Sequence, residues 1–178
     1  MRDLSDDQLA IRIQQHDTVA SAEFYIRHKR DVFQYCYRML QSKQGAEDAL
    51  QSAFLKFFSS IAALRTPATV KSWLYSIARN EVYSQLRKTR KNGSIDELEL
   101  AADDTPHEAF VRTEDAALVQ RLLAELRPEY HEVLYLLEYE QMTYAEIAGV
   151  AGISVSAVES RIFRARKELS KKLSPYMK

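Results

Sequence analysis

Hydrophobic residues recur along most of the chain at intervals of three and four, the period of a helix with one buried face. Only four glycines and four prolines interrupt the pattern. We therefore predict an all-α protein. The pattern predicts helices over the following residues: 19–41, 45–60, 69–91, 114–126, 128–139, 143–150 and 155–172.

One stretch breaks the helical pattern and divides the chain. Residues 93–113 contain Gly93, Pro106 and six acidic side chains with little periodicity, which is typical of a linker. The sequence therefore predicts two small helical domains, residues 1–92 and 114–178, joined by an acidic linker.

Charge is distributed unevenly along the chain, although its formal total is zero. Residues 1–92 have a balance of +6, residues 93–140 of −10 and residues 141–178 of +4. Two basic ends around an acidic middle favour two surfaces that meet polyanions. The alternative is that the opposite blocks attract each other within one protein.

Composition argues against several classes of protein. The four histidines lack metal-ligand spacing and no glycine-rich phosphate loop is present, so we expect no enzyme and no cofactor. No apolar run approaches the roughly 20 residues that span a bilayer, so we expect no membrane insertion. The single Cys36 is expected to be a buried thiol in a reducing cytosol.

The last two predicted helices have the pattern of a helix-turn-helix. Thr143 and Glu146 fit a capping box, Gly152 supplies the turn, and Ser154 is a candidate N-cap for the second helix. In such motifs the second helix lies in the major groove of DNA. Two packed helices around a glycine turn would show the same pattern without binding DNA.

The outer face of the helix at 155–172 carries short hydroxyl side chains first and cations later. Ser156, Glu159 and Ser160 are placed for base edges, and Arg161, Arg164 and Lys167 for phosphates. Ala157 and Phe163 complete the set of DNA-binding candidates.

The helix at 69–91 interleaves cations with aromatic rings. Its apolar stripe contains Trp73, Leu74, Ile77, Ala78, Val82 and Leu86. Its other positions, expected outside or at the edges, include Lys71, Tyr75, Arg79, Asn80, Tyr83 and Arg87. Cations among rings suit single-stranded or melting nucleic acid, because bases stack on rings while phosphates pair with cations. A core tryptophan and a solvated basic helix end would explain the same residues.

Three segments, taken together, resemble bacterial RNA polymerase sigma factors of the extracytoplasmic function (ECF) type. They are GAEDALQSAFLKFF, KSWLYSIARN and the stretch from LRPEYHEVL to SRIFRARKEL, and they occur in the family's order across residues 20–172. The alternative is a two-domain helix-turn-helix repressor, which would bind duplex DNA without polymerase.

The resemblance implies partners and the residues that meet them. The first segment would dock on the clamp of the polymerase's largest catalytic subunit through Glu47, Asp48, Gln51, Phe54 and Lys56 on the exposed side of its helix. The second would open the −10 promoter element through Lys71, Ser72, Arg79, Asn80, Tyr83 and Arg87. The helix-turn-helix would read the −35 element as duplex, and its domain would also contact the polymerase flap.

The resemblance further implies that the linker follows the polymerase's RNA exit path. We expect the free protein to be held either in a closed form or by an anti-sigma factor that covers both domains, because surfaces of opposite charge favour masking. Two positions depart from the family's pattern. Ser84 stands where many relatives carry Asp, and Glu159 stands where they carry a cation or a neutral residue. We expect Glu159 either to change the −35 preference or to turn toward arginines of its own helix.

Overall fold

The computed structural model describes residues 3–92 and 114–177. Within them, every regular element is an α-helix or a short 3₁₀ turn, which confirms the all-α prediction for these residues. The N-terminal elements are α1 (Asp6–Gln14), α2 (Thr18–Leu40), α3 (Lys43–Ser60), η1 (Ile61–Ala63), η2 (Pro67–Thr69) and α4 (Val70–Asn92). The C-terminal elements are α5 (Glu114–Ala124), α6 (Pro128–Glu138), α7 (Tyr144–Ala151), α8 (Val155–Leu173) and η4 (Ser174–Tyr176).

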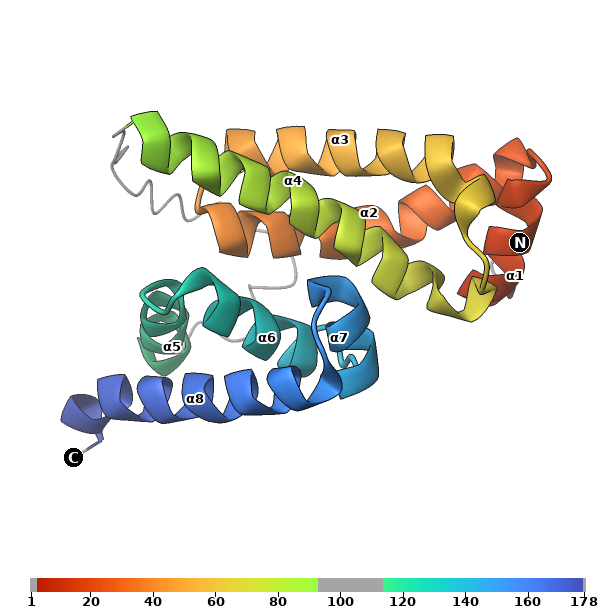
Figure 1. Cartoon of the computed structure of the whole chain (residues 1–178). Helices are drawn as coiled ribbons and strands as arrows, with labels where there is room; N and C mark the ends of the chain where they lie inside the picture. The colour runs from red at the N-terminus through yellow and green to blue at the C-terminus, as the bar shows by residue number, and fades with distance from the viewer. Residues whose placement is uncertain (1–2, 93–113, 178) are drawn as a thin grey trace.

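Helices α2, α3 and α4 run alongside one another, and α1 packs at one end of them (Figure 1). Their shared core is aromatic. The Phe24 and Phe57 rings stack with centroids 4.8 Å apart, and the Trp73 ring lies 5.5 Å from Phe57. Trp73 therefore anchors the core of the N-terminal helices, which is the structural role that the sequence left open for it.

Helix α1 is an element that the sequence pattern did not predict as a helix. It buries Leu9, Ala10 and Ile13. The Asp6 carboxylate also binds α2, at 2.8 Å from the Arg27 guanidinium and 2.9 Å from the His28 imidazole. Burial acts to raise the pKa of Asp6, but hydrogen bonds and charge from His28 and Arg27 outweigh it and lower the pKa. This cluster fixes α1 against α2.

The C-terminal helices form a second group in which α8 packs along α6 and α7 (Figure 1). Figure 1 shows α6 and α7 between α8 and the N-terminal helices. The C-terminal group therefore meets the N-terminal helices through α6 and α7, which contact α2 and α4 respectively.

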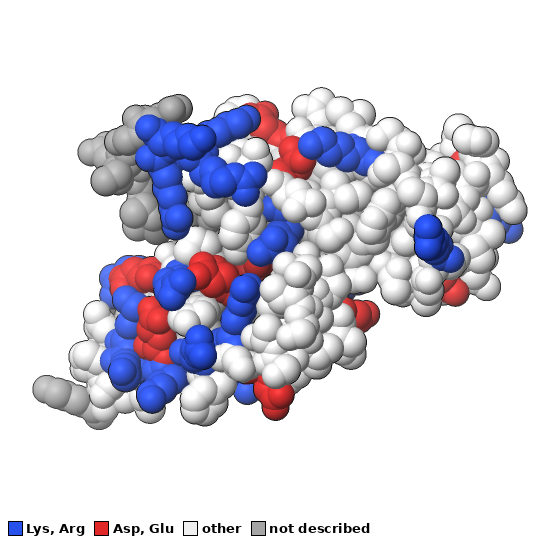
Figure 2. Space-filling model, viewed as in Figure 1, with Lys and Arg blue, Asp and Glu red and all other residues white. Residues whose placement is uncertain are grey.

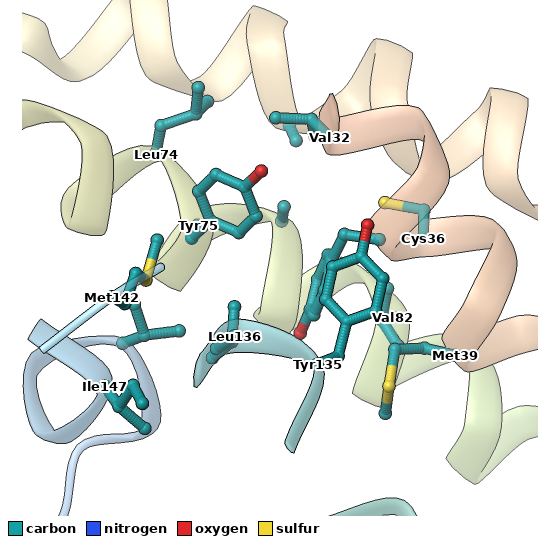
Figure 3. Close-up of a cluster of buried hydrophobic side chains, with 14 of the residues drawn as sticks. Val32, Cys36, Met39, Leu74, Tyr75, Val82, Tyr135, Leu136, Met142 and Ile147 are labelled. Atoms are coloured by element: carbon teal, nitrogen blue, oxygen red, sulfur yellow. The ribbon is translucent and has the colours of Figure 1, made fainter. Parts of the chain in front are cut away.

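The two groups share one continuous apolar core (Figure 3). Tyr75 of α4 lies beside Leu136 of α6, with Met142 and Ile147 close by. Tyr75 is fully buried, so its predicted place outside or at the edge of the helix at 69–91 is wrong. The reason is that α4 has a second buried face, covered by the C-terminal helices.

Cys36 is buried in α2, as expected. Burial, together with the nearby Glu81 carboxylate, raises the pKa of its thiol to about 12. Among the described residues no cluster of metal-ligating side chains occurs. None of the described helices is long and apolar enough to cross a bilayer. The predicted linker, residues 93–113, lies outside the described residues.

Candidate nucleic-acid interfaces

The helix-turn-helix is built by local interactions that its sequence predicts. The Thr143 hydroxyl accepts a hydrogen bond from the Glu146 backbone N–H, and the Glu146 carboxylate accepts one from the Thr143 backbone N–H at 2.8 Å. Gly152 ends α7 in the left-handed conformation, with φ of +66°. The Ser154 hydroxyl then caps α8 by accepting from the Ala157 N–H. The predicted capping box and N-cap are both confirmed.

Helix α8 buries one stripe against α6 and α7 and leaves the opposite face open. Val158, Ile162 and Ala165 form the buried stripe. The candidates that are exposed are Ser156, Glu159, Ser160, Phe163, Arg164 and Lys167. Phe163 is 69% exposed on this face. The open face therefore has the composition expected of a recognition helix.

Two of the −35 candidates, Ala157 and Arg161, are only partly exposed. Arg161 lies toward α6, where it affects Glu129. Burial acts to raise the pKa of Glu129, but its backbone hydrogen bond and the charges of Arg127 and Arg161 lower the pKa overall. Arg161 is thus at the edge of the open face, while Arg164 and Lys167 lie on it.

Glu159 lines a shallow groove on α8 together with Tyr144, Phe163, Arg166 and Lys167. Among the described residues no cation lies within ion-pair distance of its carboxylate. The nearest pairing on this helix joins Arg166 to Glu138 of α6, at 2.9 Å. The free Glu159 carboxylate favours the first of the two expectations, an altered base preference.

The C-terminal end of α4 presents a dense group of cations. Arg87, Lys88, Arg90 and Lys91 are exposed there, and Figure 2 shows them as one patch over the end of α4. Asn80 is exposed as well. Ser72, near the start of the helix, is half-buried and its hydroxyl donates to the Thr69 carbonyl.

The middle of α4 differs from the prediction, because three −10 candidates bind the C-terminal helices. Lys71 Nζ lies 3.2 Å from a Glu140 carboxylate oxygen. Arg79 Nε lies 3.0 and 3.1 Å from the two carboxylate oxygens of Glu132. The Tyr83 hydroxyl donates to Glu132 at 2.9 Å. Lys71, Arg79 and Tyr83 were expected to be available to DNA, and in this arrangement they are occupied.

Glu132 is the centre of this network and was missed by the sequence analysis. Its side chain is fully buried, and the Tyr35 hydroxyl of α2 also donates to it, at 2.7 Å. The Arg79 guanidinium lies 4.2 Å from the Tyr83 ring centroid. A signal was present in the sequence, since Glu132 falls one helical turn before Leu136 on an otherwise apolar face. A lone acid in such a stripe indicates a buried partner.

Ionisation in this network is shifted by burial and by the carboxylate. Burial and the charge of Glu132 raise the pKa of the Tyr35 and Tyr83 hydroxyls, which keeps both as donors. For Arg79, burial acts to lower the pKa, but the Glu132 charge prevails and raises it. Tyr35, Tyr83 and Arg79 therefore all remain hydrogen-bond donors toward Glu132 at physiological pH.

The expected polymerase-binding residues all belong to α3, but they do not share one exposed face. Glu47, Asp48 and Gln51 are exposed on one face. Phe54 is only 4% exposed and its ring packs against Tyr25, so its expected place on the exposed side is wrong. Lys56 is exposed but turned toward α4, where its amine lies 2.5 Å from Glu81.

Leu55 follows Gln51 by one turn on the exposed face of α3 and is 66% exposed. It was not among the expected residues. An apolar side chain one turn after an exposed glutamine, off the buried stripe of α3, was the available signal.

Comparison with known proteins agrees with this architecture. The family model for sigma-70 region 2 matches residues 24–92, and that for sigma-70 region 4 matches residues 116–169. These two ranges contain most of α2, all of α3 and α4 and most of the C-terminal helices, so together they take in well over half of the chain.

Curated relatives match almost end to end. RNA polymerase sigma factor YlaC of Bacillus subtilis is 28% identical, with 85% of this chain and 91% of the relative covered. RNA polymerase sigma-H factor of Pseudomonas aeruginosa is 29% identical, with 97% and 96% covered. ECF RNA polymerase sigma factor SigW of B. subtilis is 28% identical, with 91% and 93% covered.

Solved structures show the same fold. CnrH, solved in complex with the cytosolic domain of CnrY, superposes with a TM-score of 0.73 at 24% identity, with 96% of this chain and 97% of that chain covered. RpoE of Bartonella quintana, solved with the anti-sigma factor NepR, gives a TM-score of 0.69 at 24% identity, with 84% and 94% covered. This chain belongs to the sigma-70 family of RNA polymerase sigma factors, in its ECF group.

Proposed function

We propose that this protein directs core RNA polymerase to promoters, reading the −35 element as duplex with α8 and opening the −10 element with α4. The observation that carries the proposal is the open face of α8. Hydroxyl groups, an unpaired acid and cations follow one another along this face, and Ser154 caps the start of the helix. A recognition helix that lies in the major groove has this composition. Residues 1–92 would form the −10 and polymerase-binding domain, and residues 114–178 the −35 domain.

The first experiment is transcription in vitro from a pool of random promoter sequences, with core polymerase in the presence and absence of the protein. Transcripts that depend on the protein and share a two-part upstream motif are expected. Selection of palindromic duplexes by the isolated protein, without such transcripts, would favour the repressor alternative.

A sharper test separates the phosphate contacts of α8 from its base contacts. Arg164→Ala is expected to weaken binding at all sequences and to reduce the slope of log affinity against log salt by about one. Glu159→Gln is expected to change the preferred base at one position, with discrimination shifted by about 1–3 kcal/mol. Lys171→Ala, in the exposed last turn of α8, is the control. A change of sequence preference in Arg164→Ala would contradict the assignment.

The exposed face of α3 is proposed to dock on the clamp of the largest polymerase subunit. Glu47, Asp48 and Gln51 supply polar groups and Leu55 an apolar contact at its edge. Leu55→Asp is expected to lower affinity for core polymerase at least tenfold without changing duplex DNA binding, because a charge would replace a buried apolar contact. Val19→Asp, on the exposed side of α2, is the matched control.

Further partners follow from the same proposal. The C-terminal helices would also contact the polymerase flap, and an anti-sigma factor would hold the protein inactive. In support, RpoE of B. quintana was solved with the anti-sigma factor NepR, and CnrH with the cytosolic domain of CnrY. Because the protein would act on RNA polymerase, we propose a cytoplasmic location. Its role would be regulatory rather than catalytic.

A further inference from the structure

The loop that joins α3 to α4 runs through η1 and η2 and ends where α4 begins. Two of its apolar side chains are buried, Ile61 at 5% and Leu64 at 8% exposure. Its polar side chains, Arg65, Thr66 and Thr69, are exposed. The loop therefore presents a cation and two hydroxyl groups directly before the −10 candidates at the start of α4.

Helix α1 lies beside this loop (Figure 1), and one of its side chains binds the loop backbone. The side-chain amide of Gln14, the last residue of α1, donates to the Ile61 carbonyl at 3.1 Å and to the Leu64 carbonyl at 2.8 Å. A glutamine amide has two N–H groups, so it can serve both carbonyls at once. Gln14 thus holds both ends of the first turn of the loop.

The Leu64 carbonyl depends on this contact. Leu64 follows η1 with extended backbone, at φ −68° and ψ 113°, so its carbonyl does not continue a helical hydrogen-bond pattern. Gln14 supplies a donor that the carbonyl would otherwise take from water. The Leu64 carbonyl belongs to the peptide group that leads into Arg65. Fixing this carbonyl therefore fixes the backbone at the first exposed polar residue of the loop.

Gln14 can fix the loop because the chain is anchored on both sides of it. Before Gln14, Leu9 and Ile13 of α1 are buried. After it, the His16 N–H donates to the Ile13 carbonyl at 2.9 Å, and the Asp17 carboxylate caps α2. The Gln14 amide is therefore a fixed point from which the loop is held.

Order in this loop matters because the strand that it would meet is itself costly to prepare. Unstacking a base from duplex DNA is unfavourable. A loop that became ordered only on binding would add its own loss of conformational entropy to that cost. A loop already held by α1 avoids this second cost.

We propose that Gln14 is a positioning residue for opening of the −10 element. It holds residues 61–66 in the conformation that receives one unpaired base, and leaves Arg65 free to meet a neighbouring phosphate. The inference rests on the proposed function, because it names a residue that supports the strand-opening surface named there. Gln14 does not touch DNA itself and acts through the two carbonyls that it holds.

The test uses the protein bound to core polymerase and a series of single-stranded −10 oligonucleotides, each lacking the base at one position. Fluorescence anisotropy measures the affinity for each oligonucleotide. In wild type, removal of the captured base should lower affinity about tenfold, the size of one lost stacking contact. Gln14→Met keeps the length of the side chain but has no donor. In this variant the loss at that position should nearly disappear, while losses at other positions should match wild type.

Gln85→Met is the matched control. The Gln85 amide donates to the Gly45 carbonyl at 3.0 Å and joins α4 to α3 away from the loop. The control therefore removes the same kind of hydrogen bond between two helices of the same domain. It should keep the wild-type dependence on each base, and both variants should bind the −35 duplex as wild type does.

Hydrogen exchange in wild type tests the same point without a substitution, and decides it if Gln14→Met loses helicity by circular dichroism. The Leu64 N–H donates to the Ile61 carbonyl and the Thr69 N–H to the Thr66 carbonyl, both at 3.0 Å. With core polymerase bound, these two amides should exchange slowly before DNA is added and equally slowly afterwards. Exchange that slows only with the −10 strand present would overturn the inference, because DNA rather than Gln14 would then order the loop.

Two results of the oligonucleotide series would also overturn the inference. One is a wild-type pattern of base dependence in Gln14→Met. The other is an equal loss of affinity at every position, which would give Gln14 a purely structural role. The proposed function would survive either result as long as wild type supports promoter-dependent transcription. Absence of such transcription in wild type, with active core polymerase, would instead remove the proposed function itself.

Discussion

A carboxylate without access to water must find hydrogen-bond donors in the protein, and Glu132 finds three. Each donor comes from the N-terminal helices, although Glu132 belongs to α6. A single side chain thus holds together parts of the chain that the sequence pattern separates.

His131, the neighbour of Glu132, gives a prediction at the scale of one residue. Burial, together with the Arg38 charge, lowers the pKa of His131 from 6.5 to about 4. Between pH 6.5 and pH 4 the His131 imidazole is therefore protonated in the unfolded chain but not in the folded chain. The free energy of unfolding falls as the pH falls through this range. Between pH 7 and pH 5 the loss should be about 2 kcal/mol in the free energy of unfolding.

Denaturant unfolding at both pH values measures this loss, and His131→Gln should remove it. His16→Asn is the control, since His16 is exposed and has a φ of +64° that asparagine tolerates. An equal pH dependence in wild type and His131→Gln would show that the proton is taken up elsewhere.

Residues of the two DNA-binding helices could be predicted from the sequence to different degrees. On α8 one face is buried and the other is open, so periodicity alone separates Ile162 from Arg164. On α4 a second face is covered by helices from the other part of the chain, and periodicity contains no record of that partner. Tyr75 and Arg79 were misplaced for this reason.

At the scale of the element, local chemistry determines where the helices begin and end. The Asp17 carboxylate accepts from the Val19 and Ala20 N–H groups at the start of α2, and Ser42 caps α3 in the same way. The predicted helix limits agree with the structure to within two residues at nearly every end because these caps are encoded next to the helices they limit. Helix α1 has only nine residues, so its buried residues Leu9, Ala10 and Ile13 make too short an apolar stripe to stand out by periodicity alone. The equally short α7 was predicted because its capping box marked its start.

Two glycines of the helix-turn-helix should respond in opposite directions to alanine. An added Cβ meets no atom within 4 Å at either Gly149 or Gly152, so contacts do not decide the result. Gly149 lies within α7, where alanine should raise stability by about 0.5–1 kcal/mol. Gly152 has a φ of +66°, where alanine should lower it by about 1–2 kcal/mol.

Denaturant unfolding of the two variants against wild type measures both changes. The Gly152→Ala variant should also lose affinity for −35 duplex, because the turn sets the angle between α7 and α8. A stabilised Gly152→Ala variant would mean that the turn adopts another conformation.

At the scale of the whole molecule, the apolar core runs without interruption from α2 to α8. We therefore expect the free protein to unfold in one cooperative transition, with equal calorimetric and van't Hoff enthalpies. Differential scanning calorimetry checks this. The double variant Glu132→Gln, Glu140→Gln should broaden or split the transition, while Glu138→Gln should leave it single.

Two separate transitions in wild type would contradict a shared core and would indicate that the contacts between α4 and α7 contribute little. The association of the two groups is also what the sequence revealed least. Attraction between the opposite charge blocks was one of two interpretations of the sequence, but the pairing of particular residues such as Arg79 and Glu132 depends on the fold that brings them together.

The burial of Cys36 makes the rate of its chemical modification a measure of how often the N-terminal helices open. Because its thiol reacts only as the thiolate, and burial both shields it and raises its pKa, a modifying reagent must wait until the helices around α2 open. The rate of modification in excess reagent then counts the openings of the N-terminal helices directly, without any label. Core polymerase should hold these helices in place. The rate of Cys36 modification should therefore fall in proportion to the fraction of time that the protein spends bound.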